Sequence, residues 1–363
     1  MSRYWLYKTI FMLFGLMQTA MAVDQTSYHV QADLYSEPLP IHSFIDGWNH
    51  PQLDAGKVAF AQGHMELRHQ HDQLQYSLLW NYDYLIKFTP DTARLYYQIE
   101  NDLPLDAHKN YDLAIDAQHI ETVGFRLGKV WQYNPDWQFT TGISLLQGRH
   151  FLVGEISGQG VTGVAAQKML GQVRNVQANI NYYYDQPALH EDELGWQPKA
   201  PTGYGLALDI ALAGQLTDEL SVTANLRNAV GYMRWDKAPN TRYQASYVPE
   251  RLPSFDVQGQ LKDNELLSQR IPYQFEGSIA YQALAQPWIF SVSSLANQYK
   301  QLWQLNSFYQ NPSYQLGMHI EPQTKSYGLS LQHQNVGFRY MADHLNTNQA
   351  KRLSASLYGI YAW

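Results

Sequence analysis

The 363-residue chain contains no cysteine. Disulfides, cysteine-ligated metal or cluster sites, and a lipid attached to a cysteine behind a leader are therefore excluded. An exported protein would be free to form disulfides, so this chain must gain its stability in another way. A closed, hydrogen-bonded β-barrel is one such way.

The chain also lacks a long apolar run beyond its first 22 residues. Apolar stretches are interrupted every few residues by Asn, Gln, Asp or Gly, and the mean hydropathy is -0.41. Only helices and closed barrels satisfy every backbone polar group in lipid. A membrane protein with this sequence would have to be a barrel, and the competing hypothesis is a soluble periplasmic β-protein.

Cations are fewer than anions: Lys and Arg total 25 and Asp and Glu total 32, which gives a formal net charge of -7. This balance does not indicate a nucleic-acid partner. The patterns G-x-S-x-G, H-E-x-x-H and S-x-x-K are absent from the sequence. We therefore expect no enzyme activity, no cofactor and no metal site, although a Ser, His and Asp set brought together only by folding stays open.

The N-terminus carries the features of an export signal. Arg3 and Lys8 precede the apolar run 9–17, and Ala20-Met21-Ala22 is a small-x-small cleavage site. This order predicts a secretory signal peptide over residues 1–22, with an uncleaved anchor helix as the alternative. The predicted location is the cell outer membrane.

The dominant pattern after the leader has a period of two, as in strands with one apolar face. Residues 74–84 place Leu, Tyr and Trp side chains on one face and mostly polar side chains on the other, and 204–212 and 220–230 alternate similarly. Most runs reach ten residues or more. Strands that span lipid need about 9–11 residues, whereas strands of soluble domains most often have about 5–6.

This pattern predicts an all-β fold, a single transmembrane antiparallel barrel of 14 strands with 12 and 16 as the neighbouring possibilities. Sixteen segments are candidates for these 14 strands: 57–70, 73–86, 91–101, 108–118, 121–133, 137–148, 172–184, 202–213, 219–233, 272–283, 287–296, 299–309, 313–321, 326–333, 335–345 and 352–363. Short links near 71–72, 134–136 and 214–218 indicate periplasmic turns. Longer polar stretches at 149–171, 185–201 and 234–271 indicate extracellular loops. The high aromatic share of 14% is typical of girdles at the two membrane interfaces, although a Tyr-rich sugar-binding domain would share it.

The final strand alternates to the last residue, with Tyr361 and Trp363 at its end. In this the chain resembles outer-membrane barrel proteins, which typically end on an aromatic residue with another two positions earlier. Gly359 stands one place from the family's usual glycine. The resemblance implies that the barrel-assembly machinery is a partner and recognises Tyr361 and Trp363.

Residues 23–56 precede the first expected strand and contain Phe44, Ile45 and Trp48 among several prolines. These apolar side chains would need burial, so we expect a plug in the lumen, with a periplasmic tail as the alternative. The expected barrel domain is 57–363. A hatch before a barrel, together with the segment 226–235, is similar to the FadL group of hydrophobic-compound transporters and its TraF-like relatives.

Three further motifs have ordinary interpretations. Residues 158–163 fit G-x-G-x-x-G, but the expected antiparallel context argues against a dinucleotide site, and a flexible or pore-narrowing loop is expected instead. His69 and His71, with His64 upstream, are expected in a polar hairpin rather than around a metal. The acidic stretch 190–193 is expected to be a solvated loop, although it could attract Ca²⁺ or bridge to lipopolysaccharide.

Asp83, Asp209 and Arg227 lie on the polar faces of the expected strands and are our candidates for lining the lumen. On the lipid face a cationic side chain near the midplane would cost about 2–4 kcal/mol, so these positions should point inward. They would line a hydrophilic path or form a stabilising salt-bridge network.

The sequence favours passive passage of a small solute or hydrophobic compound through an outer-membrane barrel. A structural or assembly role in an envelope, fimbrial or secretion apparatus is the first alternative, and a lipid-modifying enzyme is the second. The expected partners are outer-membrane lipid and lipopolysaccharide, the assembly machinery and a small-molecule substrate.

Overall fold

The structure is a computed structural model that describes residues 24–164, 172–189, 191–248 and 254–363. The predicted signal peptide lies outside these residues and stays a prediction. Among the described residues, no helix is both long and apolar enough to cross a membrane.

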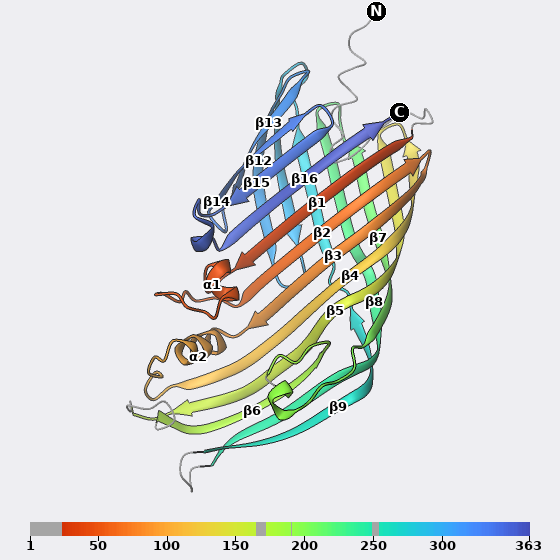
Figure 1. Cartoon of the computed structure of the whole chain (residues 1–363). Helices are drawn as coiled ribbons and strands as arrows, with labels where there is room; N and C mark the ends of the chain where they lie inside the picture. The colour runs from red at the N-terminus through yellow and green to blue at the C-terminus, as the bar shows by residue number, and fades with distance from the viewer. Residues whose placement is uncertain (1–23, 165–171, 190, 249–253) are drawn as a thin grey trace, which may run out of the picture.

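Fourteen antiparallel strands close into a barrel (Figure 1), which confirms the predicted fold class and strand number. Neighbouring strands pair in chain order except around β6 and β9, and β16 pairs with β1 to close the ring. The ring strands are β1 Gln25–Ser36, β2 Val58–His71, β3 Leu74–Phe88, β4 Asn110–Asn134, β5 Trp137–Thr162, β7 Thr202–Gln215, β8 Leu220–Val248, β10 Gln274–Tyr281, β11 Trp288–Ala296, β12 Gln301–Gln310, β13 Tyr314–Glu321, β14 Ser326–His333, β15 Val336–Ala342 and β16 Arg352–Ala362.

The barrel wall is much taller on one side than on the other. β4, β5 and β8 have 25, 26 and 29 residues, whereas β13, β14 and β15 have 8, 8 and 7. Beyond the ring, the far halves of β5 and β8 pair with β6 (Val173–Tyr184), and β9 (Ser254–Arg270) pairs with β8. This extension lies at the end opposite to the start of β1 and the end of β16 (Figure 1), which is the extracellular end if the short turns are periplasmic.

In a soluble sandwich the apolar face of each strand is buried and the polar face is exposed, whereas here the apolar face is exposed and the polar face is buried. Outward side chains such as Leu78, Leu145 and Leu329 are 60%, 60% and 66% exposed, whereas the inward neighbours Ser77 and Ser144 are buried. An apolar exterior around a polar interior matches a barrel in lipid.

The first strand begins earlier than predicted. Residues 25–36 form β1, which pairs with both β16 and β2, so the barrel starts at Gln25 and not at residue 57. Val30, Ala32 and Leu34 alternate with polar residues there. This alternation indicates a strand, but the segment was predicted to be a plug.

The predicted strand 91–101 is instead the helix α2, Pro90–Glu100. Thr89 caps its N-terminus by accepting a hydrogen bond from the Thr92 backbone, and Pro90 occupies the first turn. Ala93 and Tyr97, four residues apart, are buried on one side. A second short helix, α1, covers Ile41–Ile45 between β1 and β2.

Two predicted loops are mostly strand. Residues 149–162 continue β5, so the glycines at 158 and 160 lie in an antiparallel ladder and not in a phosphate-binding turn. Most of 234–271 belongs to β8 and β9. Pro239 suggested a loop, but it lies in β8 at a register shift, where a ladder tolerates a missing N–H.

Candidate functional site: polar contacts across the lumen

The centre of the barrel is crossed by hydrogen bonds between opposite walls. Gln274 on β10 donates to Asp83 on β3 over 2.7 Å, and Gln31 on β1 donates to Glu276 on β10 over 2.8 Å. Nearer the extracellular mouth, Asn297 donates to Gln62 over 2.9 Å. These bonds close the lumen with side chains.

The positions of these strands in the ring show that the barrel is flattened. Six ring strands separate β1 from β10 in either direction, so the two strands occupy opposite positions in the ring. A barrel of about eight strands has an interior that side chains just fill, and larger barrels leave a channel. Opposite walls of a 14-stranded ring can therefore touch only where its cross-section is narrow.

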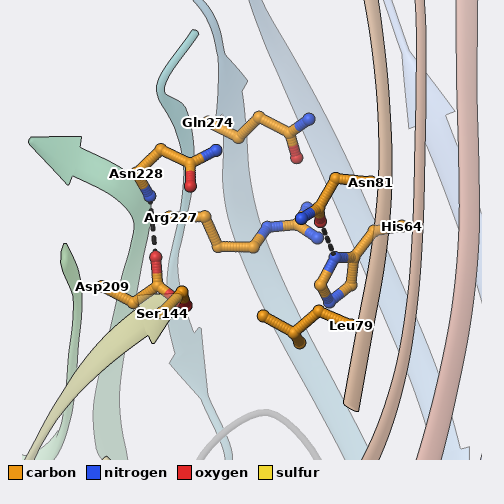
Figure 2. A pocket seen from close by; sticks show the side chains of 8 residues that line it. All are labelled: His64, Leu79, Asn81, Ser144, Asp209, Arg227, Asn228 and Gln274. Carbon is orange, nitrogen blue, oxygen red and sulfur yellow. Dashed lines mark hydrogen bonds between the residues drawn. The ribbon is translucent and has the colours of Figure 1, made fainter. Parts of the chain in front are cut away.

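Arg227 reaches across this narrow zone from β8 (Figure 2). One of its terminal nitrogens donates to Glu276 over 3.0 Å and to Gln31 over 3.3 Å, while its Nε is buried without a hydrogen-bond partner. Arg227 thus connects β8 with β10 and β1, and its Nε–H remains available to donate a further hydrogen bond.

Asp209 lies on β7 beside the same space (Figure 2). It accepts from Arg126 over 2.9 Å and from the Asn228 backbone over 2.8 Å. Arg126 also pairs with Glu66 on β2, so its guanidinium joins two sections of the wall. Asp83, the third predicted lumen residue, is 1% exposed and accepts from Gln62 as well as Gln274.

A second charged group fills the side of the lumen bounded by the short strands. Arg352 is fully buried and pairs with Asp33 over 3.0 Å and with Glu321 over 2.9 Å. Arg339 donates to Gln304 on β12. The prediction did not include these residues, nor Glu66, Arg126 and Glu276. The same criterion, a charge at an inward position between apolar neighbours, would have found Glu66 between Met65 and Leu67.

Little free space remains between these side chains. Two cavities adjoin Arg227 and His64, and each has room for about one water molecule. In the described state this zone could not hold an organic solute.

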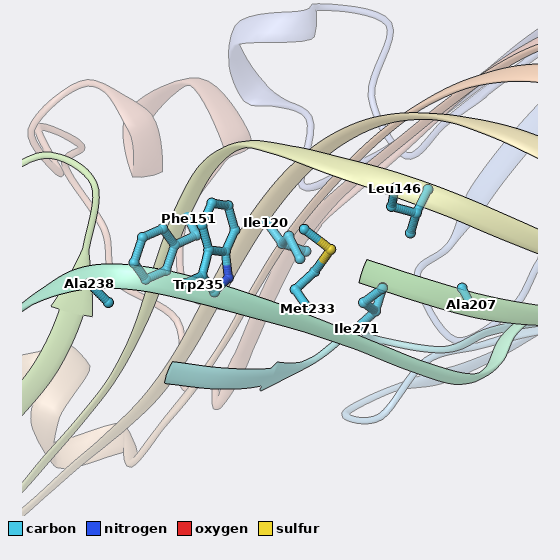
Figure 3. Packing of buried hydrophobic residues seen from close by; sticks show 8 residues of the cluster. All are labelled: Ile120, Leu146, Phe151, Ala207, Met233, Trp235, Ala238 and Ile271. Carbon is cyan, nitrogen blue, oxygen red and sulfur yellow. The ribbon is translucent and has the colours of Figure 1, made fainter. Parts of the chain in front are cut away.

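An apolar cluster lies on the inner side of the tall wall (Figure 3). Phe151 stacks on Trp235 with ring centroids 4.2 Å apart, and Met233 and Ile120 are buried beside them. Trp235 donates to Gln269 on β9, and Gln269 in turn donates to the His119 carbonyl on β4. Along β8 the interior therefore changes from the polar zone at Arg227 to the apolar cluster at Met233 and Trp235.

The predicted plug residues do not enter the lumen. Phe44 and Trp48 pack against Ala59 and Phe88, which alternate with the inward residues of β2 and β3 and therefore face outward. Ile45 is 75% exposed. Phe44 and Trp48 therefore lie against the outside of the wall, whereas Glu37, earlier in the same segment, accepts a hydrogen bond from Lys300 in the β11–β12 connection over 2.6 Å.

The histidines of residues 64–71 point to opposite sides of β2, and His190 of the acidic motif lies outside the described residues. His64 points inward and bonds Asn81 over 2.6 Å, whereas His69 and His71 have the opposite parity on β2. Glu191 is buried against Tyr182 rather than solvated. Within the described ranges, no three His, Asp or Glu side chains are placed to hold a metal ion.

One set of residues has the order of groups found in nucleophilic catalysis. His319 lies 2.9 Å through Nε2 from the Ser330 hydroxyl and 2.8 Å through Nδ1 from the Asn306 amide oxygen. Asn306 donates to Ser291 and Ser293, which fixes its oxygen toward His319. His319 is 3% exposed inside the narrow part of the lumen, so we interpret this set as part of the polar filling.

The C-terminal aromatics lie at the end of the barrel that carries the short turns. The Trp363 backbone donates to the Asp24 carbonyl over 3.0 Å, and its ring stacks on His69. Tyr361 is 48% exposed. Their recognition by the assembly machinery remains a prediction.

No model of a known protein family matches the chain, and no curated protein matches its sequence. Solved structures with a similar fold include the CymD monoaromatic hydrocarbon channel, at 9% identity over 95% of this chain and 88% of that one, with a TM-score of 0.38. The Pseudomonas putida toluene transporter TodX has 9% identity over 94% and 89% with a TM-score of 0.40. A Pseudomonas aeruginosa FadL homologue has 10% identity over 94% and 88% with a TM-score of 0.32.

One of these structures belongs to the FadL group that the sequence resembles. At such identities and TM-scores the likeness concerns the arrangement of strands and nothing finer. By its own closed ring, apolar exterior and polar interior, the chain is a β-barrel of the outer-membrane type.

Proposed function

We propose that the protein is a gated outer-membrane barrel that lets a small solute pass when its two walls separate. The supporting observation is the direct contact of opposite walls, as in Gln274 with Asp83, in a ring of 14 strands. A barrel needed only as a filled scaffold could be built from about eight strands. This barrel has more strands than such a scaffold needs, and its opposite walls are in contact. We infer from this that it has a second, rounder shape with an open lumen.

The closing groups suit such a change. They are side-chain contacts between Gln, Asp, Glu and Arg, so they can part without breaking a strand ladder. The released groups would then be solvated by water entering the lumen, which offsets the lost contacts. No strand has to unfold for the walls to separate.

The interior also suggests the kind of solute. A compound entering from outside first meets the apolar group around Trp235 and Phe151, and then the polar zone around Arg227. We infer that the solute has a sizeable apolar part, because only such a compound gains free energy from displacing these side chains.

Single-channel conductance in planar bilayers tests the proposal. The variant Gln31→Ala/Gln274→Ala removes three bonds that cross the lumen, Gln31 to Glu276, Arg227 to Gln31 and Gln274 to Asp83, and should raise the conductance and open time. The matched control is Gln75→Ala/Gln332→Ala, because these inward glutamines bond Gln70 and the Gln334 carbonyl within their own wall. If the first variant folds and stays as closed as the control, the gate is elsewhere or absent.

A structural or assembly role is favoured by one specific feature, the edge of β9. In the described part of the chain, β9 pairs only with β8, which leaves its second edge open to a strand from a partner. Leu261→Pro would block such pairing, because the backbone of Leu261 points away from β8, and Leu261→Ala would not. Loss of a cross-linked envelope partner in the proline variant alone, with unchanged conductance, would support this second role.

A further inference from the structure

The helix pair α1 and α2 lies on the outer surface of the barrel, next to the extracellular ends of β1 to β3 (Figure 1). Its inner side is packed: Phe44 contacts Trp48 at a ring-centroid distance of 5.0 Å, and both contact Phe88 at 6.4 Å. The pair is therefore part of the outward face and not a lid on the lumen.

Hydrogen bonds hold the pair in one position. Tyr97 donates to the His50 carbonyl over 2.6 Å, and Asn101 donates to the Trp48 carbonyl over 3.2 Å. Thr92 exchanges two bonds with the backbone of Ala114 on β4, at 2.9 and 3.2 Å. A helix held in this way presents a fixed outer surface.

That outer surface carries four exposed apolar side chains, with the exposed acidic residues Asp46, Glu100 and Asp102 beside them. Tyr96 and Ile99, three residues apart on α2, are 45% and 44% exposed, and Leu103 just beyond the helix is 39% exposed. The Trp48 ring contacts Tyr96 at 5.0 Å and so joins α1 to this surface, to which Ile45 adds a side chain that is 75% exposed. We call Ile45, Tyr96, Ile99 and Leu103 the helix-pair patch.

The patch continues the lipid-facing surface of β3. Every outward position of that strand is apolar or aromatic: Leu74, Tyr76, Leu78, Trp80, Tyr82, Tyr84, Ile86 and Phe88. At ~3.4 Å per residue and a tilt of ~40°, this row rises ~36 Å, whereas the apolar band of an outer-membrane barrel is ~25 Å tall. Its upper end, with the helix pair on it, therefore lies at the level of the lipid head groups.

Charge attraction is not the main feature of this region. Lys109 pairs with Asp91 over 2.8 Å, and Arg94 pairs with Asp106. Burial of the apolar side chains is the available driving force, as for amphipathic helices that lie in a membrane interface.

We propose that the helix-pair patch inserts into the interface of the outer leaflet and anchors the tall side of the barrel in lipid. The occupant of this surface is lipid, and not a protein partner or a second copy of the chain. The inference does not depend on whether the lumen opens.

The absence of native cysteine makes a depth measurement direct. Ile99→Cys would carry an environment-sensitive fluorophore in the full chain, reconstituted into phosphatidylcholine vesicles that contain lipids brominated at shallow or deep acyl positions. Leu345→Cys is the matched control, because Leu345 is 98% exposed in the β15–β16 connection at the same end of the barrel. Leu78→Cys reports the middle of the lipid-facing wall.

We expect the Ile99 label to lose emission with the brominated lipids, more with shallow than with deep bromine, and the Leu345 label to be unaffected. The Leu78 label should be quenched more by deep bromine. Quenching at Ile99 no greater than at Leu345 would overturn the proposal. A blue-shifted Ile99 label that bromine does not quench would also overturn it, since a protein surface would then cover the patch.

Discussion

Gln274 and Asp83 are joined by a 2.7 Å hydrogen bond although β10 and β3 are far apart in the ring of paired strands. The strand ladder alone would keep these strands on different sides of the lumen. The bond therefore reports the cross-sectional shape of the barrel, and this shape, more than the polarity of the lining, decides whether a solute can pass.

Arg227→Glu should make the barrel leak and favour cations. The substitution puts a second carboxylate beside Glu276 in the narrow zone, where like charges repel strongly. Reversal potentials in asymmetric KCl would measure the selectivity. Arg227→Lys keeps the charge and serves as the control, and equal selectivity of the two variants would remove Arg227 from the path.

Arg352→Ala should destabilise the barrel by about 3–5 kcal/mol, because it leaves the buried carboxylates of Asp33 and Glu321 without their cation. Arg68→Ala is the comparison: its side chain is 31% exposed, and its partner Glu66 still pairs with Arg126. That change should cost less than about 1 kcal/mol. Guanidinium unfolding in lipid vesicles would give both values, and similar costs would contradict the assignment.

Gly148→Ala should cost about 1–3 kcal/mol because its Cβ would overlap the Trp235 ring, which lies directly over this glycine. Gly160→Ala lies in the same strand, and no heavy atom comes closer than 3.8 Å to its added carbon. Unfolding midpoints of the two variants should therefore differ. Equal midpoints would mean that Trp235 does not pack as described.

The connection after α2 should loosen at acid pH. A hydrogen bond from Arg94 holds the pKa of Asp106 below its usual range. Since the folded pKa is the lower one, this contribution to stability is complete above the unfolded value of about 4 and is lost as the pH falls through the folded pKa. A spin label at Ala107→Cys should become mobile over that interval, whereas Asp106→Asn should already be mobile at neutral pH and show no such transition.

Ser330 should not react with a fluorophosphonate. The Ser330, His319 and Asn306 set has the right order, but it lies in the closed part of the lumen, where we find the polar filling of the wall. Labelling of the folded wild type that disappears in Ser330→Ala would overturn this interpretation and return the lipid-modifying enzyme as a candidate.

The sequence by itself determined which side of each strand faces lipid. Alternation of apolar and polar residues fixes the faces because a strand has a period of two, so Asp83, Asp209 and Arg227 are assigned inward without any structure. It also indicated the closed ring, since strands in lipid cannot leave an edge unpaired.

The rest of the secondary structure was harder to predict, because the local sequence of some segments fits two kinds of structure. Residues 91–101 show the alternation of a strand by chance. They form a helix because Thr89 caps its N-terminus and Pro90 occupies its first turn. Pro239 suggested a loop, but long ladders on both sides keep it in β8.

Only the tertiary structure decided which inward residues meet and where the apolar segment 41–48 lies. Pairing of Gln31 with Glu276 joins positions 245 residues apart and depends on the flattening of the whole ring, which no local pattern encodes. Phe44 and Trp48 required an apolar partner, and the sequence offered both the lumen and the outer wall. The lumen is filled by hydrogen-bonded polar groups. An apolar segment placed there would leave these groups without partners, which would cost more free energy than the burial of the apolar side chains would gain. The helix pair therefore packs outside.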